Sequence, residues 1–219
     1  MGIYHVIQDN LYTTGGFHMR TAFITIGHAH SGDNAGASYE GFQEVALVRV
    51  YVAAIQVRLL TLGWRVEIGD KNRYSADKAR ADEIGASVYI NAHLNAGMGG
   101  RASQRGEVFY DYRSTPANGP ALAAEVARRL DLAVGHMPVN LYTTTAKPCR
   151  PDTNGVARDG DYSEAYGCIA GVKAVAICTE PFFLDGGGRD YLRSPTGLFQ
   201  IGTAIANGVH AWYTARWEA

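Results

Sequence analysis

Short β-branched, apolar runs alternate along this chain with longer segments in which apolar residues recur at helical spacing. The strand-like runs cover 21–27, 64–68, 86–92, 107–112 and 173–178. The helix-like segments cover 44–62, 75–85 (with Ser75 as the expected N-cap), 120–132 and 196–212. Strands that alternate with helices build a parallel sheet. The sequence therefore predicts an α/β fold, a twisted, mostly parallel sheet with helices on both faces.

The chain of 219 residues is long enough for one domain with a sizeable core, and two full domains would be a tight fit. We assign residues 21–219 to that domain and residues 1–20, which carry little periodicity, to an N-terminal extension. The formal charge of -1 offers no large basic field for nucleic acid or an anionic membrane. We therefore expect neither as a partner.

The first residues lack the basic and apolar regions of a secretory signal peptide, and no apolar run reaches the roughly 18 residues of a membrane span. We therefore expect a soluble chain that stays in the cytoplasm until it is released. Of three cysteines, Cys178 lies in an apolar run typical of a buried thiol. A disulfide between Cys149 and Cys168 is the alternative to three free thiols.

Polar residues capable of chemistry stand where the predicted strands end. His28 follows the first strand, His93 follows the third and Glu180 follows the last, while Glu44 opens the helix after the first loop. Ligands of open α/β sheets bind beyond the carboxyl ends of the strands. Two imidazoles and a carboxylate are the ligands of a catalytic zinc ion, which makes water a nucleophile near neutral pH. A further carboxylate, Glu180, is suited to move the proton.

Each of these residues also has a structural interpretation. A single histidine at a strand end is often only hydrogen-bonded in place. Glu44 by itself is favoured at a helix start by the helix dipole, and Glu180 by itself resembles a carboxylate that caps the next helix. Convergence at one rim of the sheet is what favours a metal centre.

Five segments together resemble a known family. They are Ile26–His28, Gly41–Glu44, Lys78–Ala81, Tyr89–Ala96 and Val175–Phe183. Their order resembles the zinc-dependent N-acetylmuramoyl-L-alanine amidases of bacterial autolysins and phage endolysins. In that family a strand enters Gly-His, a helix begins at Gly-x-x-Glu, a second strand enters His-x-Asn-Ala, and a last strand ends in Glu. The resemblance covers about residues 21–213.

The resemblance implies that His28, Glu44 and His93 bind Zn²⁺ and that Glu180 is the catalytic carboxylate. It also implies a phosphorylase/hydrolase-like fold. The expected reaction is hydrolysis of the amide between the lactyl group of N-acetylmuramic acid and L-alanine of the peptidoglycan stem peptide. Because we expect no signal peptide, we also expect the protein to be a phage endolysin. A sporulation or mother-cell lysis amidase is the alternative.

Some features depart from the family pattern. A second histidine, His30, lies next to the first motif, although His28 follows the strand directly and is the favoured ligand. Residues 135–167 are predicted to be irregular and have no clear family counterpart. Three arginines are candidates for binding stem-peptide carboxylates, because a guanidinium matches carboxylate geometry: Arg150, Arg158 and Arg189. Asn95 is expected either to orient the His93 loop and contact substrate or simply to form a turn.

Two other functions remain open from the sequence. One is another zinc peptidase or amidohydrolase on the same scaffold, and the other is a non-catalytic module that binds the cell wall. The sequence leaves the oligomeric state and the target bacterium undetermined.

Overall fold

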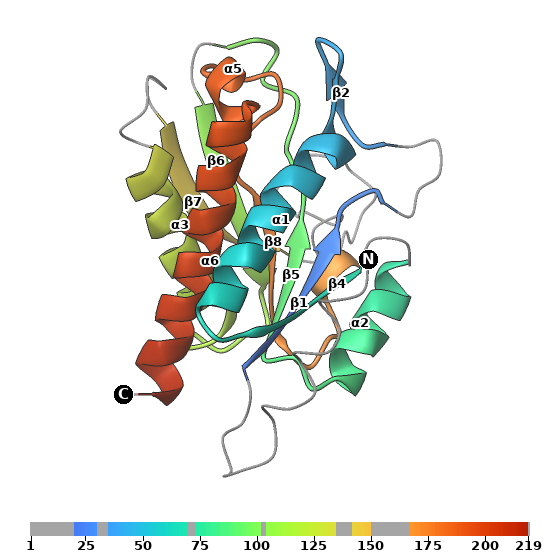
Figure 1. Cartoon of the computed structure of the whole chain (residues 1–219), viewed down its shortest axis with the longest axis vertical. Coiled ribbons are helices and arrows are strands. Elements are labelled where there is room, and N and C mark those ends of the chain that lie inside the picture. The colour runs from blue at the N-terminus through green and yellow to red at the C-terminus, as the bar shows by residue number, and fades with distance from the viewer. Residues whose placement is uncertain are drawn as a thin grey trace.

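The computed structural model describes residues 20–29, 35–69, 73–101, 104–134, 142–149 and 167–218, and it centres on a six-stranded sheet (Figure 1). In spatial order the strands are β4 (Arg65–Gly69), β1 (Thr21–Ile26), β5 (Val88–Ala92), β8 (Val175–Glu180), β6 (Gln104–Asp111) and β7 (Tyr142–Cys149). The first four are parallel to one another, whereas β6 is antiparallel to β8 and parallel to β7. The predicted mostly parallel α/β sheet is confirmed.

Strand β7 corrects the prediction that residues 135–167 are irregular. It pairs along its whole length with β6, and among the described strands it has no second neighbour, so it forms an edge of the sheet. An edge strand needs no continuous apolar run, and it tolerates a proline such as Pro148. For these reasons the segment lacks the pattern by which the buried strands were recognised.

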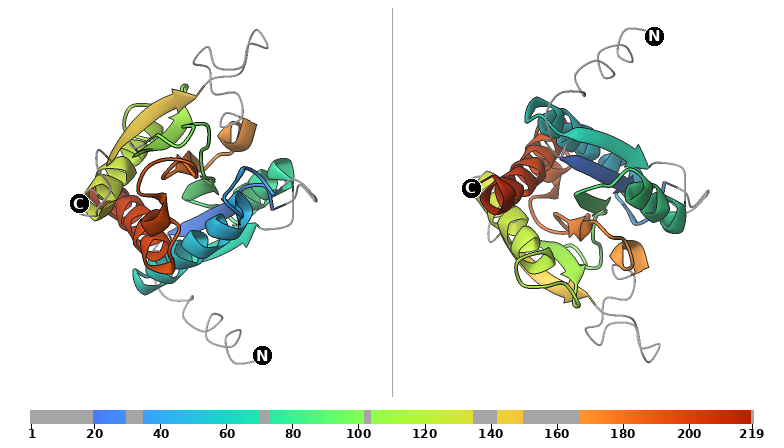
Figure 2. Two further views of the ribbon diagram at one scale, coloured as in Figure 1. Left: turned by 90° about the horizontal axis from the view of Figure 1, so that it is seen from above. Right: turned by 90° about the horizontal axis from the view of Figure 1, so that it is seen from below.

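The four helices predicted from the sequence are present, with small shifts at their ends. They are α1 (Glu44–Thr61), α2 (Tyr74–Glu83), α3 (Gly119–Val134) and α6 (Pro195–Trp217). The short α5 (Arg189–Leu192) was not predicted. The predicted N-cap of α2 is wrong by two residues, because Arg73 occupies that position and makes no side-chain cap bond. Helices α1, α3 and α6 lie together on one face of the sheet and α2 covers the other (Figure 2).

Two apolar cores follow from the alternation of side chains along the strands. In β1, Ala22, Ile24 and Ile26 pack into the larger core beneath α1, α3 and α6. Phe23 points to the opposite face, where it stacks on Tyr89 at a centroid distance of 5.9 Å. Both faces of the central strands are therefore buried, as their continuous apolar sequences predict.

The smaller core, on the α2 face of the sheet, contains the three cysteines. Cys149, Cys168 and Cys178 are all buried there, and all three are free thiols. The alternative disulfide between Cys149 and Cys168 is not formed. Within the described part of the chain, no helix combines the length and apolarity that a bilayer span requires.

A small hairpin lies between β1 and α1. Strands β2 (Ser38–Tyr39) and β3 (Phe42–Gln43) pair antiparallel across Glu40 and Gly41, whose φ angles are 50° and 81°. Two positive φ angles in a row define the type I′ hairpin turn. In Figure 1 the hairpin lies beyond the end toward which the arrowheads of β1 and β5 point.

Candidate active site

His28, Glu44 and His93 meet beyond the carboxyl ends of β1 and β5. The Nε2 atom of His28 lies 3.5 Å from Oε2 of Glu44, and the Nδ1 atom of His93 lies 3.0 Å from Oε1. One ligand atom from each residue falls within 4.8 Å of the others. The two imidazole rings stand edge to face, with centroids 4.9 Å apart. The structure thus brings together the three residues that the sequence suggests as metal ligands.

Glu44 is a buried carboxylate held by backbone amides. Its Oε2 accepts a hydrogen bond from the Ala37 amide at 2.9 Å and its Oε1 accepts one from the Leu94 amide at 3.0 Å. Burial by itself raises the pKa of Glu44, but the contact with His93 and the two amide bonds outweigh burial and lower that pKa. The carboxylate is therefore held in its charged, ligand-competent form.

Two glycines make room for the three side chains. A Cβ atom at Gly27 would lie 2.6 Å from the His93 ring and from the Ala92 carbonyl oxygen. A Cβ atom at Gly36 would lie 2.5 Å from the Glu44 carboxylate and 2.7 Å from the His28 ring. His28 itself has a φ of 60°, in the left-handed region that L-residues rarely adopt. The backbone after β1 therefore passes so close to the three side chains that no larger residue fits at Gly27 or Gly36 without a shift.

The second ring nitrogen of His93 faces the α2 side of the sheet. Its Nε2 atom lies 3.0 Å from the Tyr74 hydroxyl and 4.0 Å from the Cys168 thiol. Burial lowers the pKa of His93, but the contacts with Cys168 and Glu44 outweigh burial and raise that pKa to about 10. Tyr74 and Cys168 were not predicted from the sequence, because the contacts depend on how α2 and residues 167–170 pack on the sheet.

Glu180 ends β8 and lines the same pocket as the three ligand candidates. The pocket has a volume of about 290 Å³. The described residues that line it are His28, Gly36, Ala37, Glu44, His93, Leu94, Asn95, Ala96 and Glu180. A carboxylate that is not part of the His-Glu-His group therefore shares a cavity with it.

Of the predicted substrate-binding residues, only Asn95 is found at the pocket among the described residues. Asn95 donates from Nδ2 to Oε2 of Glu107 at 3.1 Å, and its backbone joins the Phe182–Leu184 turn. The candidate arginines Arg150 and Arg158 lie outside the described residues, as does His30.

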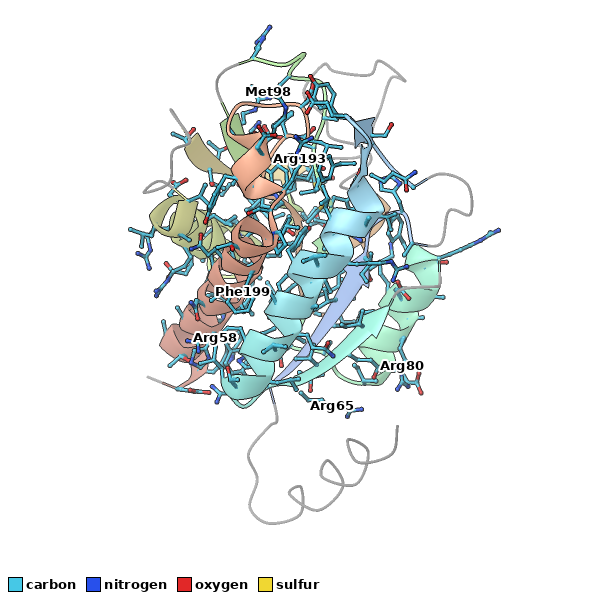
Figure 3. All side chains as sticks on the ribbon, turned by 45° about the horizontal axis from the view of Figure 1, so that its top comes forward. Arg58, Arg65, Arg80, Met98, Arg193 and Phe199 are labelled. Atoms are coloured by element: carbon cyan, nitrogen blue, oxygen red, sulfur yellow. The ribbon has the colours of Figure 1, made fainter. Side chains whose placement is uncertain are left out.

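Arg189, the third candidate arginine, is engaged at the hairpin instead. Its Nη2 atom lies 3.0 Å from Oε1 of Glu40, and Nη2 of Arg193 lies 3.0 Å from Oε2 of the same carboxylate. Figure 3 shows Arg193 at this end of the molecule, close to α5. The two arginines lower the pKa of Glu40 through hydrogen bonds. They tie the hairpin, which leads directly into Glu44, to the segment that follows β8.

Glu107 is a buried acid that the sequence analysis missed. It lies directly opposite Glu180 in the antiparallel pairing of β6 and β8, and it is 1% exposed. Its Oε1 atom lies 2.6 Å from Nζ of Lys147 and 3.1 Å from Nε of Arg105. The segment 107–112 was predicted to be a strand, but sequence alone does not show that this strand pairs with β8.

The donor set suits zinc better than a harder ion. Zinc binds histidine nitrogens and carboxylate oxygens together, whereas Mg²⁺ and Ca²⁺ prefer oxygen ligands alone. Three protein ligands also leave a coordination position for water or substrate, which distinguishes a catalytic site from a closed structural one. The fold and the site together are those of an α/β protein with a candidate metal centre at the carboxyl end of its sheet.

Comparison with known proteins assigns the family. Residues 24–211 match the profile of the Amidase_3 family, described as N-acetylmuramoyl-L-alanine amidase. The match spans most of the chain, and the protein belongs to this amidase family. A search of curated protein sequences finds no match.

Solved structures share the fold at low sequence identity. Cwp6 from Clostridium difficile superposes with a TM-score of 0.70 and 21% identity, over 89% of this chain but only 29% of Cwp6. The amidase AmiC2 of Nostoc punctiforme gives 0.68 and 18%, over 92% of this chain and 100% of AmiC2. The catalytic domain of the CD27L endolysin, which targets C. difficile, gives 0.59 and 21%, over 88% and 97%. This chain therefore corresponds to less than a third of Cwp6 and to the whole of the AmiC2 structure.

Proposed function

We propose that this protein is a zinc-dependent peptidoglycan amidase. It hydrolyses the amide between the lactyl group of N-acetylmuramic acid and L-alanine of the stem peptide. The observation that carries the proposal is the shared pocket in which His28, Glu44 and His93 cluster and Glu180 stands apart from them. Membership of the amidase family supports the choice of bond.

In this proposal His28, Glu44 and His93 hold the zinc ion. Zinc in such a site acts as a Lewis acid that polarises a carbonyl group and makes water acidic near neutral pH. Glu180 accepts the proton of the attacking water and returns it to the leaving nitrogen of L-alanine, which departs as an amine. Asn95, at the same pocket, contacts the substrate, and Arg150 and Arg158 bind stem-peptide carboxylates.

A digest of purified peptidoglycan tests the reaction. We expect mass spectrometry to find intact stem peptides that begin with L-alanine, together with glycan strands stripped of peptide. Shortened stems still attached to sugar would identify a zinc peptidase instead. No released product from a folded, zinc-loaded protein would favour the non-catalytic wall-binding module. An unchanged wall would therefore overturn the proposal.

Zinc dependence is tested separately. A chelator should abolish stem release, and a stoichiometric amount of zinc should restore it, because the three ligand candidates together can hold one ion. His93→Ala should neither retain zinc nor regain activity. Full activity after complete metal removal would contradict the zinc proposal while leaving the amidase assignment to the digest.

We also propose that residues 21–219 form the catalytic domain and that residues 1–20 are an extension dispensable for hydrolysis. The family match begins at residue 24, which supports this boundary. A chain that lacks residues 1–20 should release stems at the rate of the full chain. A large loss of activity would show that the extension contributes to catalysis.

In the proposed setting, the protein is a phage lysin that degrades the host cell wall. It remains in the cytoplasm until the membrane is breached. Cells that express the protein should remain intact and should lyse when a pore-forming agent permeabilises the inner membrane. Lysis of expressing cells without that agent would show export by another route and would favour an autolysin or sporulation amidase.

A further inference from the structure

Glu107 contacts the pocket through Asn95. Because Glu107 and Glu180 are directly opposite in an antiparallel pair, their side chains leave the same face of the sheet, with Cβ atoms about 5 Å apart in such pairs. Asn95, which lines the pocket beside Glu180, donates from Nδ2 to Oε2 of Glu107 at 3.1 Å. A buried carboxylate thus lies beside the pocket and bonds to one of its lining residues.

The surroundings of Glu107 hold its carboxylate in one position. Its Oε1 atom is occupied by Lys147 at 2.6 Å and by Arg105 at 3.1 Å, which leaves Oε2 for Asn95. The two cations compensate the negative charge that burial would otherwise make costly. Arg105 is itself positioned over the Phe183 ring at 4.7 Å. The orientation of the carboxylate is therefore determined by strands β6 and β7 and by the turn after β8.

A carboxylate can only accept hydrogen bonds, so it determines which way the Asn95 amide points. The NH₂ group must face Glu107. The Oδ1 atom must then face away, and it accepts a hydrogen bond from the Ala96 amide at 2.8 Å. One N–H and one oxygen lone pair of Asn95 remain for a ligand. A neighbouring donor and acceptor complement an amide group, which peptidoglycan carries both in its acetamido substituents and in its stem peptide.

We propose that Glu107 is a positioning residue that fixes Asn95 in the orientation that binds an amide group of the substrate next to the scissile bond. The inference rests on the proposed amidase function. Lys147 and Arg105 contribute to the same positioning, because they hold the Glu107 carboxylate that Asn95 contacts. No metal-ligand atom takes part in it.

The test is a double-mutant cycle with Glu107→Gln and Asn95→Ala, measured as kcat/KM for stem release. Glu107→Gln keeps the shape and the contact with Lys147, but its amide can pair with either orientation of Asn95. We expect it to lower kcat/KM roughly tenfold, because it replaces a hydrogen bond to a charged group with a weaker one to a neutral group and no longer fixes the orientation of Asn95. Zinc content should stay at the wild-type level. Asn95→Ala should cost at least as much, and the double variant should be no worse than Asn95→Ala.

Glu125→Gln is the matched control, because Glu125 also pairs with two cations, Arg128 and Arg129, but on α3 away from the pocket. It should leave kcat/KM unchanged. Three results would overturn the inference: Glu107→Gln as active as wild type, losses that multiply in the double variant, or loss of zinc in parallel with activity. If wild-type protein releases no stems, the proposed function fails instead, so the two failures are distinguishable.

Discussion

His93 is contacted on both ring nitrogens, and these contacts explain its orientation. Nδ1 faces the Glu44 carboxylate and Nε2 faces the Tyr74 hydroxyl, each at 3.0 Å. A histidine ligand is oriented by a hydrogen bond to the nitrogen that does not bind the metal. The geometry therefore presents Nδ1 to the centre of the group and assigns the Tyr74 contact to the opposite side of the ring.

Among single residues, the proposed roles of Glu180 and of the proposed metal ligands should be separable by mutation. Glu180→Gln keeps the size of the side chain but removes its ability to take a proton. We expect stem release to fall at least a hundredfold, the usual contribution of a general acid or base. Zinc content, measured by atomic absorption, should be unchanged. Near-normal turnover would show that another group moves the proton.

Gly27→Ala should damage the site without removing any polar group from it. The new methyl would lie 2.6 Å from both the His93 ring and the Ala92 carbonyl, and neither can move far inside the sheet. We expect zinc affinity to fall by more than tenfold, measured by competition with a chromophoric chelator. Gly167→Ala is the control, because its added methyl meets nothing within 4 Å. Equal affinities in the two variants would contradict the packing argument.

Among the elements, α1 has a double role. Its first residue is Glu44, and about two turns later the Tyr51 hydroxyl donates to the His93 backbone carbonyl at 2.8 Å. The same helix packs closely on α6, where Gly202 lies against Tyr51, Ala54 and Ile55. Close contact with α6 thus supports the helix that carries one ligand candidate, Glu44, and hydrogen-bonds the backbone of another, His93.

Gly202→Ala tests this contact at the level of the two helices. Replacing glycine by alanine inside a helix normally stabilises it by about 0.5–1 kcal/mol. Here the added methyl would lie 2.6 Å from Ala54 Cβ and 3.0 Å from the Ile55 nitrogen. We expect a net destabilisation of about 1–3 kcal/mol, typical of overpacking. Chemical denaturation measures it, and a stabilised variant would show that the helices separate easily.

The strands and helices differ in how well sequence predicts them. Strands β1, β5 and β8 are buried on both faces, so their residues form continuous apolar runs, and the long helices show their apolar spacing. Strand β7 and the hairpin β2–β3 lack such patterns because β7 is an edge and the hairpin lies outside the sheet. Their pairing depends on contacts with distant residues, which a local pattern does not contain.

For the whole molecule, metal binding and folding should be linked. The three ligand candidates come from the turn after β1, the start of α1 and the end of β5, so they meet only in the folded chain. A ligand that binds only the folded state at 100 times its dissociation constant adds about 2.7 kcal/mol. For a chain of this size that raises Tm by roughly 5–10 °C.

This thermal shift is measured on chelator-stripped protein by calorimetry with and without zinc. His93→Ala should show little shift, whereas His210→Gln, a histidine change on α6 remote from the pocket, should retain it. A similar rise in all three proteins would indicate that zinc binds elsewhere on the chain.

Local sequence patterns were enough to predict the class of fold, the positions of the main strands and helices, and the four acids and imidazoles at the strand and helix ends. They could do so because burial leaves a local record in apolar spacing, and because parallel strands bring their carboxyl ends to one edge. Tertiary structure decided the partners of those residues: the antiparallel reversal that sets Glu107 opposite Glu180, the Tyr74 contact with His93, and the hairpin tied down by Arg189 and Arg193. These contacts join residues far apart in the chain, and their energies depend on the packing of whole elements rather than on any neighbouring residue.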